Sequence, residues 1–149
     1  MQTPVDNPKI RLSSVGNPII INQAPIQMDG ELASSDLKIQ YRVSAEINRP
    51  QSIVNVIVLL TYITDSKTLF SGSLTTTFNV VDLPSYITVK EGEDKFKIES
   101  NFLPTLISIA FSTTRGYYVR ELQGTILAPY PFPMISIDSL LRRATYKLI

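Results

Sequence analysis

LKIQYRVSAEIN, residues 37–48, places an apolar side chain at every second position and a polar side chain at each position between. Six consecutive alternations are typical of a β-strand with one buried face and one face in solvent. Residues 53–64, IVNVIVLLTYIT, are apolar on both faces, which predicts a central strand or a strand covered by a partner chain. Residues 70–80 alternate again after a short polar link. The three segments therefore predict an antiparallel meander.

The segment before this meander has the features of an edge strand. Residues 9–28 contain short apolar groups separated by Gly16, Pro18 and Pro25. Proline donates no ladder hydrogen bond, so we expect an edge strand here, either whole or broken in two. Residues 1–8 contain two prolines among polar neighbours and predict an irregular start. The length of 149 residues fits a single domain, 1–149.

A long helix is predicted after the sheet. Ser100 or Asn101 is positioned to cap it, Pro104 suits its first turn, and we expect it to reach about Leu122 and stop at Gly124. Its apolar residues cover more than one face, so a second surface is needed besides the sheet. The expected fold class is α+β: a four-stranded antiparallel meander, one long helix packed on it, a proline-rich crossing segment and a short C-terminal helix.

The middle of this helix consists of small side chains and includes Gly116, which costs about 1 kcal/mol relative to alanine in a helix interior. Close approach of another helix would compensate for that cost. The alternative is a local bend, or an end of the helix near Gly116. On the first reading the oligomer interface comprises Ala110, Thr113, Thr114 and Gly116.

The stretch LAPYPFPMI, residues 127–135, alternates prolines with large apolar residues and must therefore be extended. Aromatic side chains stiffened by proline lose little entropy on binding, and methionine adapts to varied shapes. This combination favours loose recognition of apolar client polypeptides. The alternative is that Phe132 and Met134 cover the protein's own core or its dimer interface. The predicted client-binding residues are Tyr117, Leu127, Tyr130, Phe132 and Met134.

The composition argues against several classes of function. The net charge is +1 without a basic run, which disfavours nucleic-acid binding, and the lack of Cys and His removes the commonest nucleophile pairs and metal ligands. We therefore expect no catalytic residues, no metal and no cofactor, and we interpret the charged cluster at 90–95 as a solvated loop. The N-terminus does not resemble a signal peptide, and no apolar stretch reaches membrane-spanning length. We expect a cytoplasmic protein without membrane insertion.

The stretch from Phe102 to Leu141, FLPTLISIAFSTTRGYYVRELQGTILAPYPFPMISIDSLL, resembles the SecB family of bacterial export chaperones. Its proline at the start of the long helix, its Arg115-Gly116 pair, its proline-rich crossing and its short leucine-containing helix correspond to that family's pattern. The resemblance implies a homotetramer built as a dimer of dimers, with helices packed between the dimers and sheets facing outward. It also implies apolar grooves that bind unfolded polypeptide without ATP.

The sequence departs from SecB in two respects. SecB is strongly acidic and carries a C-terminal tail that engages the translocation ATPase, whereas this chain is nearly neutral and ends at Ile149. We therefore do not expect coupling to that ATPase, although protein export remains one setting for a SecB-like chaperone. The alternative function is a structural or adaptor protein that binds one defined partner, for example a toxin–antitoxin client.

Overall fold

The computed structural model describes residues 8–25, 36–65, 67–89, 95–99 and 101–149. Residues 1–7 of the expected irregular start and residues 90–94 of the charged cluster lie outside these ranges. The elements, in chain order, are β1 (Ile10–Asn22), β2 (Leu37–Asn48), β3 (Ile53–Thr64), β4 (Lys67–Val80), the short 3-10 helix η2 (Leu83–Tyr86), β5 (Ile87–Val89), β6 (Phe96–Ile98), α1 (Phe102–Glu121), α2 (Ile137–Arg143) and β7 (Thr145–Leu148).

The main sheet has five strands in the order β1-β4-β3-β2-β7, and β5 pairs with β6 in a separate two-stranded sheet. The strands β2, β3 and β4 form the predicted meander, because each pairs antiparallel with the next. β1 is the expected edge strand. It is unbroken, pairs with β4, and shifts register at three places along its length. The α+β fold class expected from the sequence is confirmed.

The fifth strand, β7, is a feature that the sequence did not predict. It pairs parallel with β2, from Ser44 opposite Thr145 to Ile47 opposite Leu148. The chain enters it directly from α2, because Ala144 at the end of that helix already has extended backbone angles. β7 therefore forms the second edge of the sheet.

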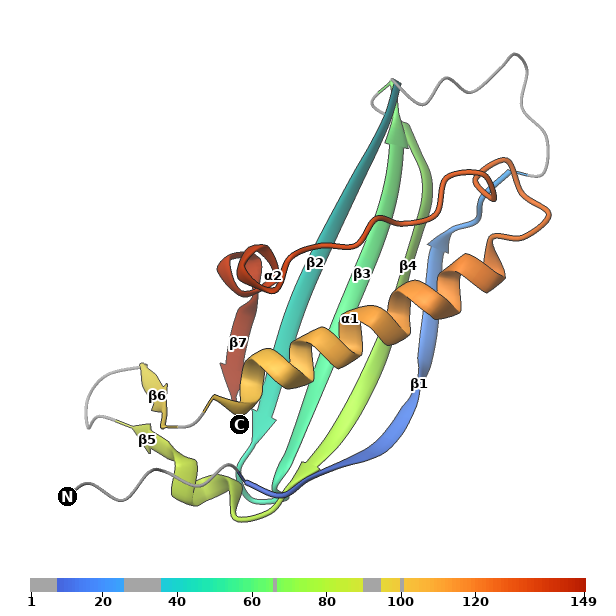
Figure 1. Ribbon diagram of the computed structural model, residues 1–149. Coiled ribbons are helices and arrows are strands. Elements are labelled where there is room, and N and C mark those ends of the chain that lie inside the picture. Colours follow the sequence, from blue (N-terminus) through green and yellow to red (C-terminus); the bar gives the residue numbers. More distant parts are fainter. Residues whose placement is uncertain (1–7, 26–35, 66, 90–94, 100) are drawn as a thin grey trace.

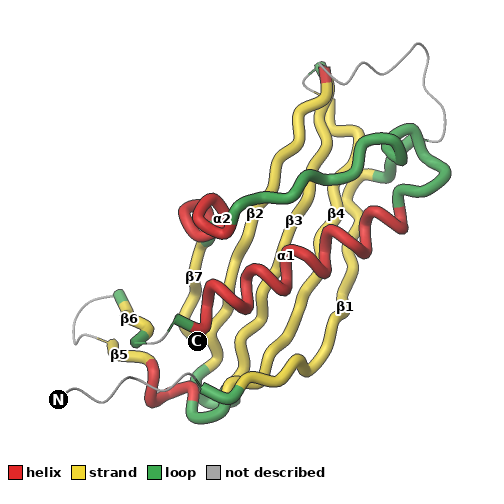
Figure 2. The backbone as a smooth tube through the Cα atoms, in the orientation of Figure 1, coloured by secondary structure: helices red, strands yellow, loops and turns green. Residues whose placement is uncertain are grey.

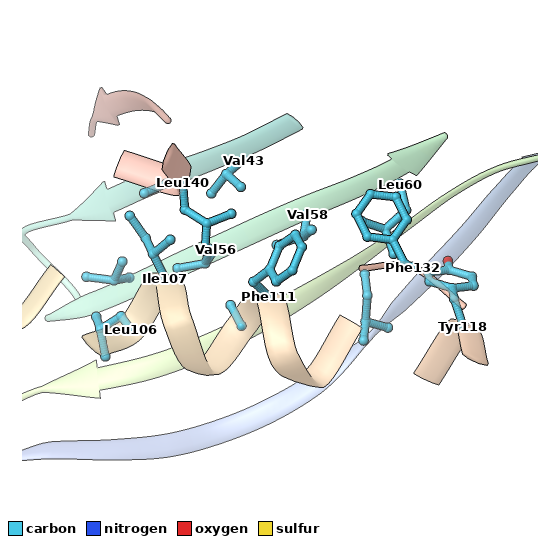
Figure 3. Close-up of a cluster of buried hydrophobic side chains, with 14 of the residues drawn as sticks. Val43, Val56, Val58, Leu60, Leu106, Ile107, Phe111, Tyr118, Phe132 and Leu140 are labelled. Atoms are coloured by element: carbon cyan, nitrogen blue, oxygen red, sulfur yellow. The ribbon is translucent and has the colours of Figure 1, made fainter. Parts of the chain in front are cut away.

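One face of the sheet carries α1, which runs diagonally across the strands, and the extended segment that follows α1 crosses the same face before reaching α2 (Figures 1 and 2). The core lies between this layer and the sheet. Figure 3 shows Val56 and Val58 of β3 facing Ile107 and Phe111 of α1. These side chains are almost completely removed from water, and at about 25 cal/mol per Å² their burial is the main stabilising contribution.

The two faces of β3 differ in burial. The side chains at alternate positions from Val54 to Thr64 face the helix layer and are buried, whereas those from Ile53 to Ile63 on the opposite face are only partly buried. β3 is therefore central in the sheet as predicted, and its outward face keeps partly exposed apolar groups.

The limits of α1 agree with the sequence. Pro104 lies in the first turn, and Gly124 has a φ of 81°, a left-handed conformation that suits glycine after a helix end. Asn101 occupies the N-cap position, but its side chain makes no capping hydrogen bond. The helix continues through Gly116, so the alternative in which the helix ended there is wrong.

Candidate functional site

The crossing segment, defined here as residues 122–136, joins α1 to α2 and is fixed through its own main chain to both β3 and α1. The hydroxyl of Tyr62 on β3 donates to the carbonyl of Tyr130 at 2.8 Å. The guanidinium Nε of Arg115 on α1 donates to the carbonyl of Phe132. These two bonds hold the path of the backbone through main-chain atoms of the segment.

The five predicted client-binding residues do not share one surface. Leu127 is 0% exposed and Phe132 is 1% exposed, because both side chains point into the core. The prediction that these two bind clients is therefore wrong, and for Phe132 the alternative of covering the protein's own core is confirmed. Tyr117 and Tyr130 are partly buried, and Met134 is 73% exposed.

Aromatic edge-to-face contacts fix Phe132 in its core position. Its ring centroid lies 5.8 Å from that of Tyr62 and 5.9 Å from that of Phe111. Such contacts stabilise by about 0.5–1.5 kcal/mol beyond the area that they bury. Phe132 is therefore an anchor that holds the neighbouring exposed positions in place.

Tyr118 is a second anchor, which holds α1 against β4, and this role was not predicted from the sequence. Its ring lies so close to Gly72 of β4 that a Cβ at this glycine would be 2.7 Å from the ring. Its hydroxyl donates to the carbonyl of Ser73. Burial raises the pKa of both Tyr118 and Tyr62 from 10.0 to about 12, so the two phenols remain neutral donors further into the alkaline range than exposed tyrosines do.

The four predicted oligomer-interface residues also divide into two sets. Ala110 and Thr114 are both 0% exposed on the side of α1 that faces the sheet, and the Thr114 hydroxyl donates to the Ala110 carbonyl. They offer no surface to another chain, so their assignment to an interface is wrong. Thr113 is partly exposed and Gly116 is exposed on the outer side of the helix. A Cβ added at Gly116 would meet nothing within 4 Å.

The outer side of α1 carries short side chains next to one large apolar one. Ser108, Ser112 and Gly116 are exposed along it, and Ile109 is 41% exposed. The spacing of four residues places the three small residues in one row. This row would let a second helix approach closely.

Strand β1 carries the densest group of exposed apolar side chains. It lies at the edge of the sheet and is exposed along almost its whole length. Contiguous exposed apolar surface of this kind marks sites of protein interaction. The large hydrophobic residues exposed on this strand are Ile10, Leu12, Val15, Ile19, Ile20 and Ile21.

Two hollows flank α1. A cavity of about 440 Å³ near the start of the helix is lined by Lys95, Phe96, Ile98, Leu103 and Tyr146. A second cavity, of about 260 Å³, lies near its end and is lined by Ile20, Gln23, Ala24, Phe70, Glu121, Leu122 and Thr125. Both combine apolar walls with a charged side chain, and neither was predicted, because each joins segments distant in sequence.

Within the described part of the chain, no group of three or more acidic residues is arranged to hold a metal ion. The helices in those same ranges are too short or too polar to cross a membrane. Burial raises the pKa of Tyr146 beside the larger cavity.

No protein-family model and no curated protein sequence matches this chain. A solved structure does match this chain. It is the Mycobacterium tuberculosis SecB-like chaperone Rv1957 in complex with a ChAD peptide from the antitoxin HigA1 (Rv1956). The chain is similar to a SecB-like chaperone. The similarity covers 86% of this chain and 87% of the other, with 14% sequence identity and a TM-score of 0.43. The similarity is one of backbone path, and it identifies no residues of a functional site.

Proposed function

We propose that the protein is a SecB-like molecular chaperone that holds unfolded or partly folded polypeptides by hydrophobic contact, without ATP and without a catalytic centre. It acts as a single domain, 1–149, in the cytoplasm. The observation that carries the proposal is Met134, which is 73% exposed on a segment whose backbone is fixed by Tyr62 and Arg115. A large apolar side chain kept in water at this level has no role in the core.

The physical basis is a low entropic cost of binding. Pro131 and Pro133 restrict the backbone between Tyr130 and Met134, and the anchored carbonyls restrict it further. Binding therefore orders little beyond the side chains themselves. Methionine accommodates differently shaped client groups, which suits many sequences bound at modest affinity.

We further propose a homo-oligomer of the dimer-of-dimers type. The exposed apolar face of β1 supports one contact, and the row of small residues on α1 supports the other. Thr113 and Gly116 remain candidates for the helix contact. The proposal does not extend to the translocation ATPase.

The function is tested by the aggregation of chemically denatured citrate synthase, diluted into buffer without ATP and followed by light scattering. The protein should suppress scattering at near-stoichiometric concentration. The combined substitutions Tyr130→Ser and Met134→Ser should weaken suppression, because both remove apolar side chains while leaving the Tyr62 bond to the Tyr130 carbonyl in place. A matched control is Val81→Ser, which removes an exposed apolar side chain at the end of β4.

Two results would contradict the proposal. If scattering is unchanged at several-fold molar excess, the protein does not hold unfolded chains. If it instead captures a single partner in fixed stoichiometry and protects no denatured client, it is an adaptor for one protein, for example within a toxin–antitoxin system. Multi-angle light scattering tests the oligomer separately. A tetramer of about four times 16.7 kDa is expected, and a monomer would refute that part.

A further inference from the structure

One half of the outer edge of β2 has no partner strand among the described residues. β2 pairs with β3 over its whole length, Leu37–Asn48. On its other side it pairs with β7 only over Ser44–Ile47. The stretch Leu37–Val43 therefore presents a strand edge next to the point where β7 begins.

The direction of the hydrogen bonds identifies the backbone groups at this edge. The amide of Ile149 donates to the carbonyl of Ile47 at 2.8 Å, so the polar groups of Ile47 point toward the β7 side. Alternate residues of a strand direct their N–H and C=O groups to the same edge. The groups of Leu37, Ile39 and Tyr41 therefore point toward the open edge, where no backbone bond of the described residues reaches them.

The side chains along this edge differ between the two faces of the sheet. Leu37, Ile39 and Tyr41 are partly buried on the side of α1, whereas Lys38 and Arg42 are exposed on the opposite side. Four residues of strand separate the two cations, a distance of about 13 Å. An added strand would therefore meet an apolar row on one face and two positive charges on the other. At the Tyr41 end of the apolar row, Arg143 of α2 lies over the aromatic ring, with its Cζ 5.3 Å from the ring centroid.

The cross-strand neighbours leave both cations available. Lys38 lies opposite Ile63 and Arg42 lies opposite Leu59 on β3, so neither has an acidic neighbour there. Further along β2, Glu46 already lies beside Lys147 of β7. Free positive charge is therefore concentrated on the open half of the edge.

We propose that the β2 edge at Leu37–Val43 binds an extended client segment in which apolar and acidic residues alternate. The client backbone adds to the sheet as a further strand, its apolar side chains lie beside Ile39 and Tyr41, and its carboxylates lie beside Lys38 and Arg42. This proposal rests on the holding function above and adds to it a class of preferred client sequence.

A second copy of this chain fits the same edge poorly. Two β2 edges paired with each other would place Lys38 and Arg42 of both copies on one face of the joined sheet. Like charges at neighbouring cross-strand positions are destabilising. Backbone addition by an acidic strand satisfies the edge without that repulsion.

The test uses a fluorescein-labelled nine-residue peptide of alternating Val and Glu, with binding followed by anisotropy. A Val–Lys peptide should bind at least about tenfold more weakly than the Val–Glu peptide, because two favourable ion pairs become two repulsions. Two further Val–Glu peptides carry N-methyl groups on alternate amides, one on the odd positions and one on the even positions. Whichever of them is methylated on the amides that face β2 should lose binding, because it cannot complete the hydrogen-bond ladder with that strand. Hydrogen exchange should slow at Leu37, Ile39 and Tyr41 when the unmodified peptide binds.

The protein variant Lys38→Glu with Arg42→Glu should reverse the preference between the two peptides. A control is Lys67→Glu, because Lys67 is an exposed cation on β4, which is separated from β2 by β3. Equal binding of the Val–Glu and Val–Lys peptides, or full binding of the N-methylated peptides, would overturn the inference. If either of these results is found and the unmodified protein still protects citrate synthase, only the edge-binding inference fails and the holding function stands. If the protein also fails to protect citrate synthase, both the inference and the holding function are refuted.

Discussion

Gly72 allows Tyr118 to lie flat against β4, and replacing it with alanine should destabilise the protein. A Cβ at this position would lie 2.7 Å from Cζ of Phe70 and 2.7 Å from both Cε1 and Cζ of Tyr118. Contacts below 3.0 Å are essentially never observed for a Cβ, so at least one ring must move. Tyr118 is the costlier one to displace, because its hydroxyl donates to the Ser73 carbonyl.

The size of the effect follows from three contributions. Overpacking a core costs about 1–3 kcal/mol, and weakening the Tyr118 hydrogen bond costs about 1 kcal/mol more. Alanine recovers about 0.5–1 kcal/mol because it restricts the unfolded chain more than glycine does. The expected net loss for Gly72→Ala is about 2 kcal/mol. For a chain of this length, the melting temperature should fall by about 4–8 °C.

Urea denaturation followed by circular dichroism, at one fixed protein concentration, measures this loss. The matched control is Gly16→Ala on β1, where an added Cβ would meet nothing within 4 Å and where stability should change little. Combining Gly72→Ala with Tyr118→Leu should cost less than the sum of the two single changes, because the second removes one of the two obstructing rings. Equal losses at the two glycines, or strict additivity in the double variant, would refute the steric explanation.

Three further predictions concern buried groups and the outer helix face. The Oγ1 of Thr76 is buried and has no hydrogen-bond partner among the described residues, so Thr76→Val should raise the free energy of unfolding by about 1 kcal/mol in urea titrations. Gly116→Ala should stabilise the monomer by about 0.5–1 kcal/mol, but should weaken a tetramer packed on this face, as measured by analytical ultracentrifugation. Because burial raises the pKa of Tyr62 and Tyr118 from 10.0 to about 12, the stability they contribute is complete below pH 10 and lost as pH rises toward 12. Urea titrations of Tyr62→Phe between pH 8 and 11.5 should show a shallower alkaline decline, and an unchanged slope would contradict the assignment.

The meander was predictable because burial imposes a period of two on each of its strands. The alternation in β2 and the two apolar faces of β3 are local properties of the sequence. The pairing of β1 with β4, in contrast, depends on which edge of the finished sheet is free. β7 is only four residues long and follows α2 directly, without a glycine or proline to separate the two elements. Neither feature leaves a local signal.

Two of the four interface residues predicted on α1, Ala110 and Thr114, were misassigned, although the sequence contained a signal that separates them from the other two. Ala110 and Thr114 follow Leu103 and Ile107 at spacings of three and four, which places all four on one side of the helix. Once Leu103 and Ile107 are assigned to the sheet, the small residues in phase with them must also face it. Gly116 is out of phase with this row and belongs to the outer side.

The crossing segment was harder to divide, because its prolines impose an extended path without fixing its rotation. Pro129, Pro131 and Pro133 are all exposed, which turns Phe132 inward between them. Met134 has the same parity as Phe132 and is nevertheless exposed, whereas the next residue, Ile135, packs against the core. A period of two therefore does not continue through the whole segment.

The position of these anchors makes the client-binding residues separable from the fold. Tyr62 and Arg115 bind main-chain carbonyls of the crossing segment, and the Met134 side chain is 73% exposed. Substitution of Met134 should therefore change client holding at nearly constant stability. Changes at the anchors themselves should release the segment and alter both. Measuring the two properties side by side separates the surface that binds from the structure that presents it.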